Sequence, residues 1–390
     1  IINRGQKQSW YMLSALDENS PYTIPGEEQS FSLMGGQSFS NIFRMKRTLT
    51  EGSFLGVLAT DRRMANNNGS GSTVGFDTRY RLNKKYQIEF QTVFSKTVEP
   101  NDSLLVDGSF FGDDYSFTFD GESFTGNAVE LELRRDTEHW NLEMGYDHST
   151  PTFRAENGFV SSNNEQRLYM ESVWIYSPNT FLNKFVGGFY TGINRNFDGE
   201  IKRQSTFIFS NFKLPKQTNI NSNFNYTSFR RFKETNFKNL WKMDTNINSK
   251  ITKSTSIYFG GNYGIQLATF LEVPETGYSF SFYSGVDQQL FERLLMSGSF
   301  SQYQMKTLDK KDEYYSGYLA SLKMNYQYST DISFRLIGQY NDFDQSFQIQ
   351  PLLSYQPNPF TIFYIGTSNN QVDGETNESQ VYLKLQYLFN

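Results

Sequence analysis

The sequence predicts an all-β protein: a transmembrane, antiparallel, up-and-down β-barrel of about 20 strands (roughly 18 to 20). Two observations lead to this fold class. Aromatic residues make up 17% of a chain in which only 37% of the residues are hydrophobic, and this composition suits strands with one apolar and one wet face. Apolar and polar side chains also alternate at every second position in many segments, as they do on the two faces of a strand.

The alternation is clear in the last segment, "VYLKLQYLFN". Its apolar face consists of Val381, Leu383, Leu385, Tyr387 and Phe389. The same pattern recurs in "VGFDTRYRL", "YQIEFQTVF", "VELELRR" and "ISFRLIGQY". The wet faces carry charges at mid-strand, which would be hard to bury between the sheets of a soluble sandwich. The pattern therefore favours a barrel whose aromatic face meets lipid and whose wet face meets water.

The connections between the predicted strands give a second test of this fold. We expect strands near residues 8–16, 31–49, 52–62, 73–82, 85–97, 123–135, 138–148, 165–176, 183–195, 200–213, 216–229, 237–250, 253–267, 277–288, 291–306, 313–328, 330–342, 345–356, 360–369 and 379–389. Tight connections such as "TEG", "NK" and "LP" alternate with long ones such as "RMANNNGSGS". Bacterial outer-membrane barrels have short periplasmic turns and long extracellular loops, so we expect both termini to be periplasmic.

Composition excludes several other classes of protein. The chain has no Cys, which excludes disulfides, thiolate metal sites and a cysteine nucleophile. Its 36 basic and 41 acidic residues give a formal net charge of −5, so we expect no nucleic-acid partner. The strand pattern continues to the end without a linker, which predicts a single barrel domain over residues 1–390. The start, "IINRGQKQ", has no signal peptide, and we expect that something precedes it.

The apolar residues of the last segment also resemble the C-terminal assembly signal of outer-membrane barrels. Phe389 would be the terminal aromatic of this signal, although Asn390 follows it. We therefore expect outer-membrane lipid and the barrel-assembly machinery to be partners of the chain, the latter through its C-terminal strand. Other outer-membrane or surface proteins are further expected partners.

Charged side chains on the wet faces are the candidate functional residues of the lumen. They are Arg44, Lys46, Arg79, Arg81, Glu130, Glu132, Arg134, Glu143, Lys323, Arg335 and Lys384. Charges of both signs are interspersed among them. They could pair across strands and solvate a wide wall, or they could form a constriction that selects solutes by charge. The sequence leaves both roles open.

Other motifs give no catalytic or metal site. The long connection "VDGSFFGDDYSFTFDGE" holds Asp107, Asp113, Asp114, Asp120 and Glu122. These carboxylates could bind Ca²⁺ or a glycan, but their spacing matches no EF-hand loop, and we interpret the segment as a solvated external hairpin. "NNNGSGS" lacks the Lys-Ser/Thr of a phosphate loop. No GxSxG motif accompanies His139 and His148. We therefore expect no enzymatic activity and no cofactor.

Several stretches resemble one family of bacterial surface proteins. They are "KQSWYMLSALDEN", "SNIFRMKRTLTEGSFLGVLATDRR", "GFDTRYRLNKKYQIEFQTVFSKT", "TPTFRAENGFVSSNNEQRLYMESVWIYSP" and "SFQIQPLLSYQPNPFTIFYIGTSN". The family is an uncharacterised one from Bacteroidota and related bacteria, in which a membrane barrel follows a domain similar to carbohydrate-binding module family nine. The resemblance implies an N-terminal β-rich domain outside these 390 residues. It carries no ligand site over to this chain.

The predicted function is therefore that of an outer-membrane protein of bacteria. The first hypothesis is a pore or transport channel for small hydrophilic solutes, with a link to carbohydrate implied by the resemblance. The alternative is a non-conducting structural or accessory subunit of a larger outer-membrane assembly, secretion or nutrient-uptake complex. Aromatic residues facing lipid would serve either role, so they do not discriminate between the two hypotheses.

Overall fold

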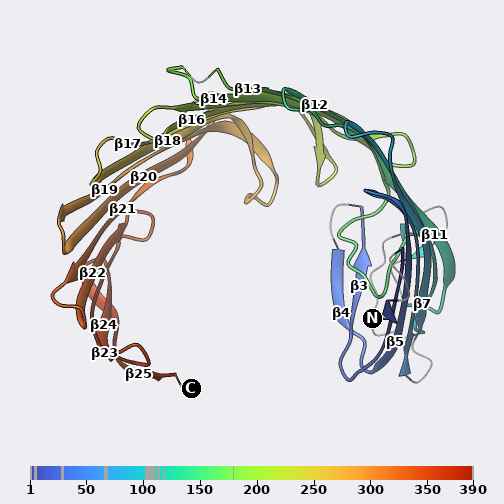
Figure 1. Cartoon of the computed structure of the whole chain (residues 1–390), viewed down its shortest axis with the longest axis horizontal. Coiled ribbons are helices and arrows are strands. Elements are labelled where there is room, and N and C mark those ends of the chain that lie inside the picture. Colours follow the sequence, from blue (N-terminus) through green and yellow to red (C-terminus); the bar gives the residue numbers. More distant parts are fainter. Residues whose placement is uncertain are drawn as a thin grey trace. The chain divides into compact units, whose positions relative to one another are not determined.

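The protein is described by a computed structural model that covers residues 2–3, 7–27, 30–65, 69–101, 110–111, 115–116, 119–178 and 180–388. Its regular elements are β-strands, and the described part of the chain has no α-helix (Figure 1). Among these residues, no helix is long and apolar enough to cross a membrane. The all-β fold class predicted from the sequence is confirmed.

Twenty strands of ten or more residues lie in the described ranges, in agreement with the predicted number. The first ten are β2 (Gln8–Asp17), β5 (Ser38–Thr50), β6 (Ser53–Met64), β7 (Ser70–Arg81), β8 (Tyr86–Val98), β11 (Ser123–Arg135), β12 (Trp140–Ser149), β13 (Glu165–Tyr176), β14 (Lys184–Arg195) and β15 (Ile201–Leu214). The others are β16 (Thr218–Phe232), β17 (Thr235–Lys250), β18 (Thr255–Ala268), β19 (Glu275–Phe291), β20 (Leu294–Thr307), β21 (Glu313–Gln327), β22 (Ile332–Asn341), β23 (Ser346–Asn358), β24 (Thr361–Val372) and β25 (Glu375–Tyr387). Short strands are β1 (Ile2–Asn3), β3 (Pro21–Pro25), β4 (Ser30–Met34), β9 (Phe110–Phe111) and β10 (Tyr115–Ser116).

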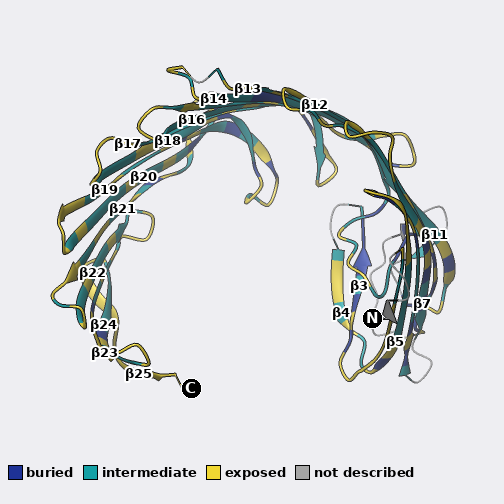
Figure 2. Ribbon diagram, in the orientation of Figure 1, coloured by how far each residue is buried: buried dark blue, intermediate teal, exposed yellow. Residues whose placement is uncertain are grey.

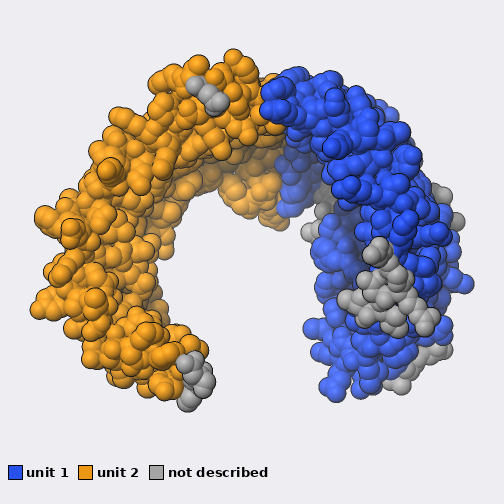
Figure 3. Space-filling view, in the orientation of Figure 1, with its two compact units in different colours: residues 1–174, 188–206, 227–238 blue, residues 175–187, 207–226, 239–390 orange. Residues whose placement is uncertain are grey.

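The chain divides into two compact units (Figure 3). Unit 1 comprises residues 1–174, 188–206 and 227–238, and unit 2 comprises residues 175–187, 207–226 and 239–390. In unit 1, β2, β5, β6, β7, β8, β11, β12 and β13 pair in this order, each antiparallel to the next. In unit 2, β17 to β25 pair in the same consecutive, antiparallel manner. This is the up-and-down order that the alternating pattern predicts.

The register gives each sheet two distinct faces, because residues opposite each other on neighbouring strands share a face. In unit 1, Arg44 lies opposite Leu58, Asp77 opposite Gln91, and Glu89 opposite Glu132. We call the face that carries Arg44, Asp77 and Glu89 the polar face of unit 1. The opposite, apolar face exposes large side chains such as Phe94 and Leu131, which are 59% and 46% accessible.

In unit 2, the last strands also have two distinct faces. Val381, Leu383 and Leu385 lie opposite Thr367, Ile365 and Phe363 of β24. These three residues of the predicted assembly signal, together with Tyr387, are exposed. Phe389 and Asn390 lie outside the described residues. The recognition of this segment by an assembly machinery stays a prediction.

Near the N-terminus, the predicted strand 31–49 is two strands, β4 and β5, which makes this part of the prediction wrong. Gly36 has a φ of 85°, a left-handed conformation that breaks the strand. Gly35 lies against Tyr22 and Met64, where a Cβ atom would come within 2.5 Å of the Tyr22 ring. The segment expected to be a plain loop before it contains β3, which pairs with β4 as a hairpin.

Two of the connections predicted to be long are tight turns. Lys233 and Glu234 alone join β16 to β17, and both have positive φ. Asp373 and Gly374 alone join β24 to β25, also with positive φ. This conformation matches the two-residue hairpin turn that Asp-Gly favours. At both places the strands extend further than predicted, so tight and long connections do not alternate throughout.

Buried residues lie at and beside the long connections of unit 1 (Figure 2), and many of them are apolar. They include Tyr22, Ile24, Met64, Phe111, Phe119, Phe124 and Phe153. A single sheet layer has no interior of its own, so this small core arises because the connections fold onto the sheet. We call the described parts of the 18–37, 99–122 and 150–164 connections the cap.

Glycines on the polar face allow the cap to lie directly on the sheet. A Cβ atom on Gly71 would come within 2.0 Å of Glu156 Cγ, and one on Gly126 within 2.4 Å of the Phe153 backbone nitrogen. Arg62, on the polar face of β6, donates a hydrogen bond of 2.7 Å to the carbonyl of Glu156. The 150–164 connection therefore covers part of the polar face instead of projecting away from it.

Candidate functional site

Charges on the polar face of unit 1 are separated by sign. Arg44, Lys46, Arg62, Arg79 and Arg81 lie with Asp77 on this face of β5, β6 and β7, and we call this group the basic strip. On β8, β11, β12 and β13 the same face carries the acidic strip: Glu89, Glu130, Glu132, Glu143, Asp147, Glu165 and Glu171 with Arg134 and Arg167. The predicted candidates of unit 1, whose charges were expected to be interspersed, thus fall into two adjoining strips.

The basic strip is held by contacts between neighbouring strands. Arg44 donates two hydrogen bonds to Asp77, and the bond from Nη2 to Oδ2 measures 2.7 Å. The Lys46 ammonium lies 3.9 Å from the centroid of the Phe54 ring, which is the distance of a cation–π contact. Arg79 Nη2 donates to Glu89 Oε2 at 3.1 Å, and this ion pair joins the two strips.

Arg134 is the centre of the acidic strip. Its Nη2 donates to Glu132 Oε2 at 3.0 Å, and its Nε lies 3.2 Å from Glu143 Oε2. Its Nη1 lies 3.9 Å from Glu89 Oε1. The Tyr169 hydroxyl is 3.2 Å from Glu132 Oε2 and 3.3 Å from Glu143 Oε1. The single Arg134 guanidinium therefore lies close to three carboxylates, and the acidic strip retains a net negative charge.

The cluster around Arg134 contains residues that were predicted from the sequence and residues that were not. The structure brings the predicted Arg79, Glu132, Arg134 and Glu143 together through shared ion pairs and adds Glu89 and Tyr169. Glu89 could have been found, because it lies on the wet face of "YQIEFQTVF". Tyr169 could not have been found from the sequence. The alternation of polar and apolar residues does not tell which tyrosines on a polar face reach a carboxylate.

A cavity of about 680 Å³ opens at the acidic strip. Its lining includes Gln91, Glu130, Asp147 and Arg167 from the strands and Phe159 from the 150–164 connection. Arg167 Nε donates to Asp147 Oδ1 at 2.8 Å. The cap therefore provides one side of a polar cavity in unit 1.

Three predicted candidates lie in unit 2 and form no such cluster. Lys323 lies opposite Ile337 and Arg335 opposite Asn325, which places both on one face, and the register of β23 to β25 adds Lys384 to this face. The Lys384 ammonium lies 5.9 Å from the Tyr364 ring centroid. In unit 1, the remaining candidate, Arg81, has an exposed side chain.

The cap contains a buried ion pair that the sequence analysis missed. The side chains of Glu99 and Arg154 are 1% and 2% exposed, and the Arg154 guanidinium donates to Glu99 Oε1. The same guanidinium lies over the rings of Phe111 and Phe124, at 4.9 and 4.7 Å from their centroids. Burial raises the pKa of Glu99 to about 7, although Arg154 acts in the opposite direction. The two residues lie in different connections, so no local pattern links them.

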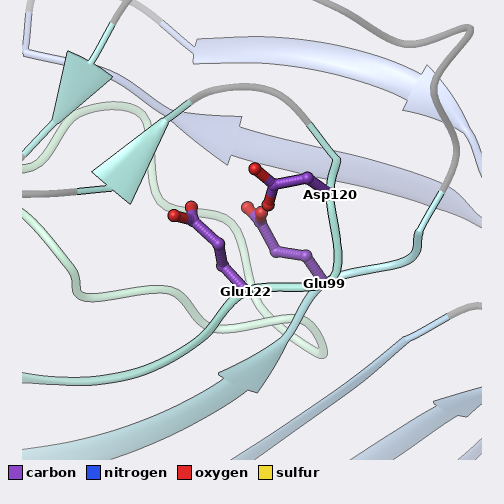
Figure 4. A group of neighbouring side chains, drawn as sticks. All are labelled: Glu99, Asp120 and Glu122. Atoms are coloured by element: carbon purple, nitrogen blue, oxygen red, sulfur yellow. The ribbon is translucent and has the colours of Figure 1, made fainter.

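Glu99 is also the buried member of a group of three carboxylates (Figure 4). One oxygen each of Glu99, Asp120 and Glu122 lie within 4.8 Å of one another. Carboxylate oxygens are ligands that Ca²⁺ prefers, so these three residues could hold a cation. The buried Phe119 beside them shows that this part of the connection is not the solvated hairpin expected from the sequence. Asp107, Asp113 and Asp114 lie outside the described residues.

Comparisons with known proteins add little to this geometry. No family model matches the sequence, and no curated protein matches it. Among solved structures, the siderophore receptor PirA from Acinetobacter baumannii is similar at 10% identity and a TM-score of 0.45, over 100% of this chain and 75% of that one. The copper transporter OprC is similar at 11% identity and 0.48, over 99% and 77%. The ferric enterobactin receptor PfeA from Pseudomonas aeruginosa is similar at 9% and 0.45, over 97% and 73%. Similarities this low do not indicate what the chain binds or transports.

Proposed function

We propose that the chain is a bacterial outer-membrane β-barrel protein whose polar face lines a passage for small hydrophilic solutes. In this proposal the apolar face meets lipid, and the β5–β6, β7–β8 and β11–β12 connections lie in the periplasm. A link to carbohydrate rests on the family resemblance alone. The two-faced, up-and-down sheet of long strands supports the membrane location, because a spanning strand needs about 9–11 residues.

The observation that carries the proposal is the contrast between the two faces. The basic and acidic strips hold more charged groups than their mutual ion pairs neutralise, and such groups require water. The other face exposes aromatic and aliphatic side chains along successive strands, including Phe76, Phe94 and Leu131. Exposed apolar surface on this scale indicates contact with a partner or a membrane. A barrel wall with its apolar face in lipid and its polar face in water accounts for both properties.

Conductance in planar lipid bilayers tests the proposal. We expect the purified full chain to give stepwise ionic currents and to make liposomes permeable to small sugars. Folded protein is recognised by its heat-modifiable mobility on gels, which is a property of intact barrels. Correctly folded chain that gives neither current nor sugar permeability would contradict a transport role.

One observation favours the alternative of a non-conducting accessory subunit. The β3–β4 hairpin is tied to the 150–164 connection and to strand β15, since Asn163 donates to the Gly26 carbonyl at 3.1 Å and Lys202 of β15 donates to the Glu27 carbonyl at 2.7 Å. The cap thus covers part of the polar face in unit 1. Replacing residues 20–35 with a short Gly-Ser linker separates the two functions. A conducting barrel should give a larger current without the hairpin. An accessory subunit should give no current with or without it.

A further inference from the structure

We propose that the cavity at the acidic strip binds a small organic cation, a protonated amine on a short carbon skeleton. Strands β8, β11, β12 and β13 line the cavity together with residues 159–162 of the cap. Its volume of about 680 Å³ is sufficient for a small molecule. The inference concerns binding, so it holds whether or not the chain conducts.

Charge is the first argument for a cationic ligand. Glu130 lines the cavity with an exposed side chain, and no hydrogen bond or ion pair joins it to another described residue. Glu132, Asp147 and Glu89 repel its negative charge, and Arg167 attracts it. Arg167 already bonds to Asp147 at 2.8 Å. Among the described residues, no cation is therefore in direct contact with the Glu130 carboxylate, and a ligand ammonium would fill this place.

The apolar lining is the second argument, and it favours an organic cation over a metal ion. Phe159 is 75% exposed and lines the cavity, and it stacks on no other ring among the described residues. Val93, Phe153 and Val160 add further apolar surface. Ammonium groups are attracted to aromatic faces, and their carbon skeletons gain from apolar contact. A hydrated metal ion would gain nothing from these side chains.

Isothermal titration calorimetry of the full chain in an uncharged detergent tests the proposal. The probe is 1,4-diaminobutane, and the neutral match is 1,4-butanediol, which has the same skeleton. We expect saturable binding of the diamine, no measurable binding of the diol, and weaker binding as NaCl is raised, because salt screens the attraction.

Two variants test whether the amine binds in this cavity, and a third variant is the control. Glu130→Gln removes the unpaired charge without breaking a described contact, and we expect it to weaken diamine binding about tenfold or more. Phe159→Ala removes the aromatic surface from a cap position and should weaken it several-fold. Glu272→Gln, an exposed acid in a connection of unit 2, should leave binding unchanged.

The outcomes distinguish the inference from its rivals. Equal binding of diamine and diol, or no binding of the diamine at all, would overturn it. Wild-type affinity in both Glu130→Gln and Phe159→Ala would mean that amines bind elsewhere, which also overturns it. If Glu130→Gln loses heat-modifiable folding, Phe159→Ala decides alone, because it leaves the strands intact.

Discussion

Arg154 and Glu99 form an ion pair in the cap of unit 1 with both side chains at most 2% exposed, although they lie 55 residues apart in the chain. Removing one partner of such a pair leaves an uncompensated buried charge, which costs about 3–5 kcal/mol. Arg154→Met should therefore lower the free energy of unfolding by about this amount. The double variant Arg154→Met with Glu99→Leu should recover much of the loss. Unfolding by urea in detergent, followed by tryptophan fluorescence, measures both, and an equal or larger loss in the double variant would contradict the pairing.

Gly126 should be needed for the cap to rest on the sheet. Because a Cβ atom there would lie 2.4 Å from the Phe153 backbone nitrogen, Gly126→Ala should push the 150–164 connection away from the polar face. We expect faster cleavage of this connection by a protease. Gly338→Ala is the matched control, since a Cβ atom at Gly338 has nothing within 4 Å. Equal cleavage rates in the two variants would show that the connection does not pack on β11.

Much of the wall could be predicted from the sequence, because the alternation of side chains determines both the strands and their faces. Leu131 and Glu132 were assigned to opposite faces by position alone, and the register agrees. The cap could not be predicted in this way. Contacts such as that between Arg62 and Glu156 join segments 94 residues apart and leave no local period in the sequence.

Some missed features did have a signal. The glycine pair before Gln37 indicates the break between β4 and β5, and Asp373-Gly374 is a favoured hairpin turn. The glycine pair was absorbed into the predicted strand 31–49, because alternating positions on both sides continued the strand pattern. Asp373-Gly374 was placed in a predicted connection longer than the observed turn. The cavity at the acidic strip could not be predicted. Glu130 was predicted as a lumen charge, but whether it has a partner depends on where Arg134 and Arg167 point, which the sequence does not show.

The two faces can be compared on one strand in unit 2. Phe300 lies on the apolar face of β20, opposite Ser284, and Ser301 lies on the other face, opposite Tyr283. If the apolar face meets mid-bilayer lipid, Phe300→Arg should destabilise the folded barrel by about 2–4 kcal/mol. Ser301→Arg introduces the same side chain into water and should cost much less. Reversible folding into lipid vesicles measures both costs, and the opposite order would mean that the lipid face is assigned to the wrong side.

Protease accessibility on intact cells tests the proposed orientation. A cleavable epitope inserted after Gly69 lies in a connection at the cap end of unit 1, and one inserted after Asn83 lies in the short connection between β7 and β8. With the β7–β8 connection in the periplasm, added protease should cut the first insertion and spare the second. Cell lysis should expose both. Cleavage of the Asn83 insertion on intact cells, with the Gly69 insertion protected, would reverse the orientation.

The separation of charge on the polar face predicts how the passage would select ions. Glu132 and Glu143 share Arg134, whereas Arg44 belongs to the basic strip and pairs with Asp77. Charges within a Debye length of about 8 Å of a passing ion act on it at physiological salt. Glu132→Gln with Glu143→Gln should therefore shift the reversal potential in a KCl gradient toward anion preference. Arg44→Gln should shift it toward cation preference, and Glu272→Gln, outside the strips, should not change it. Identical reversal potentials in all these variants, with conductance retained, would show that neither strip lines the path of the ions.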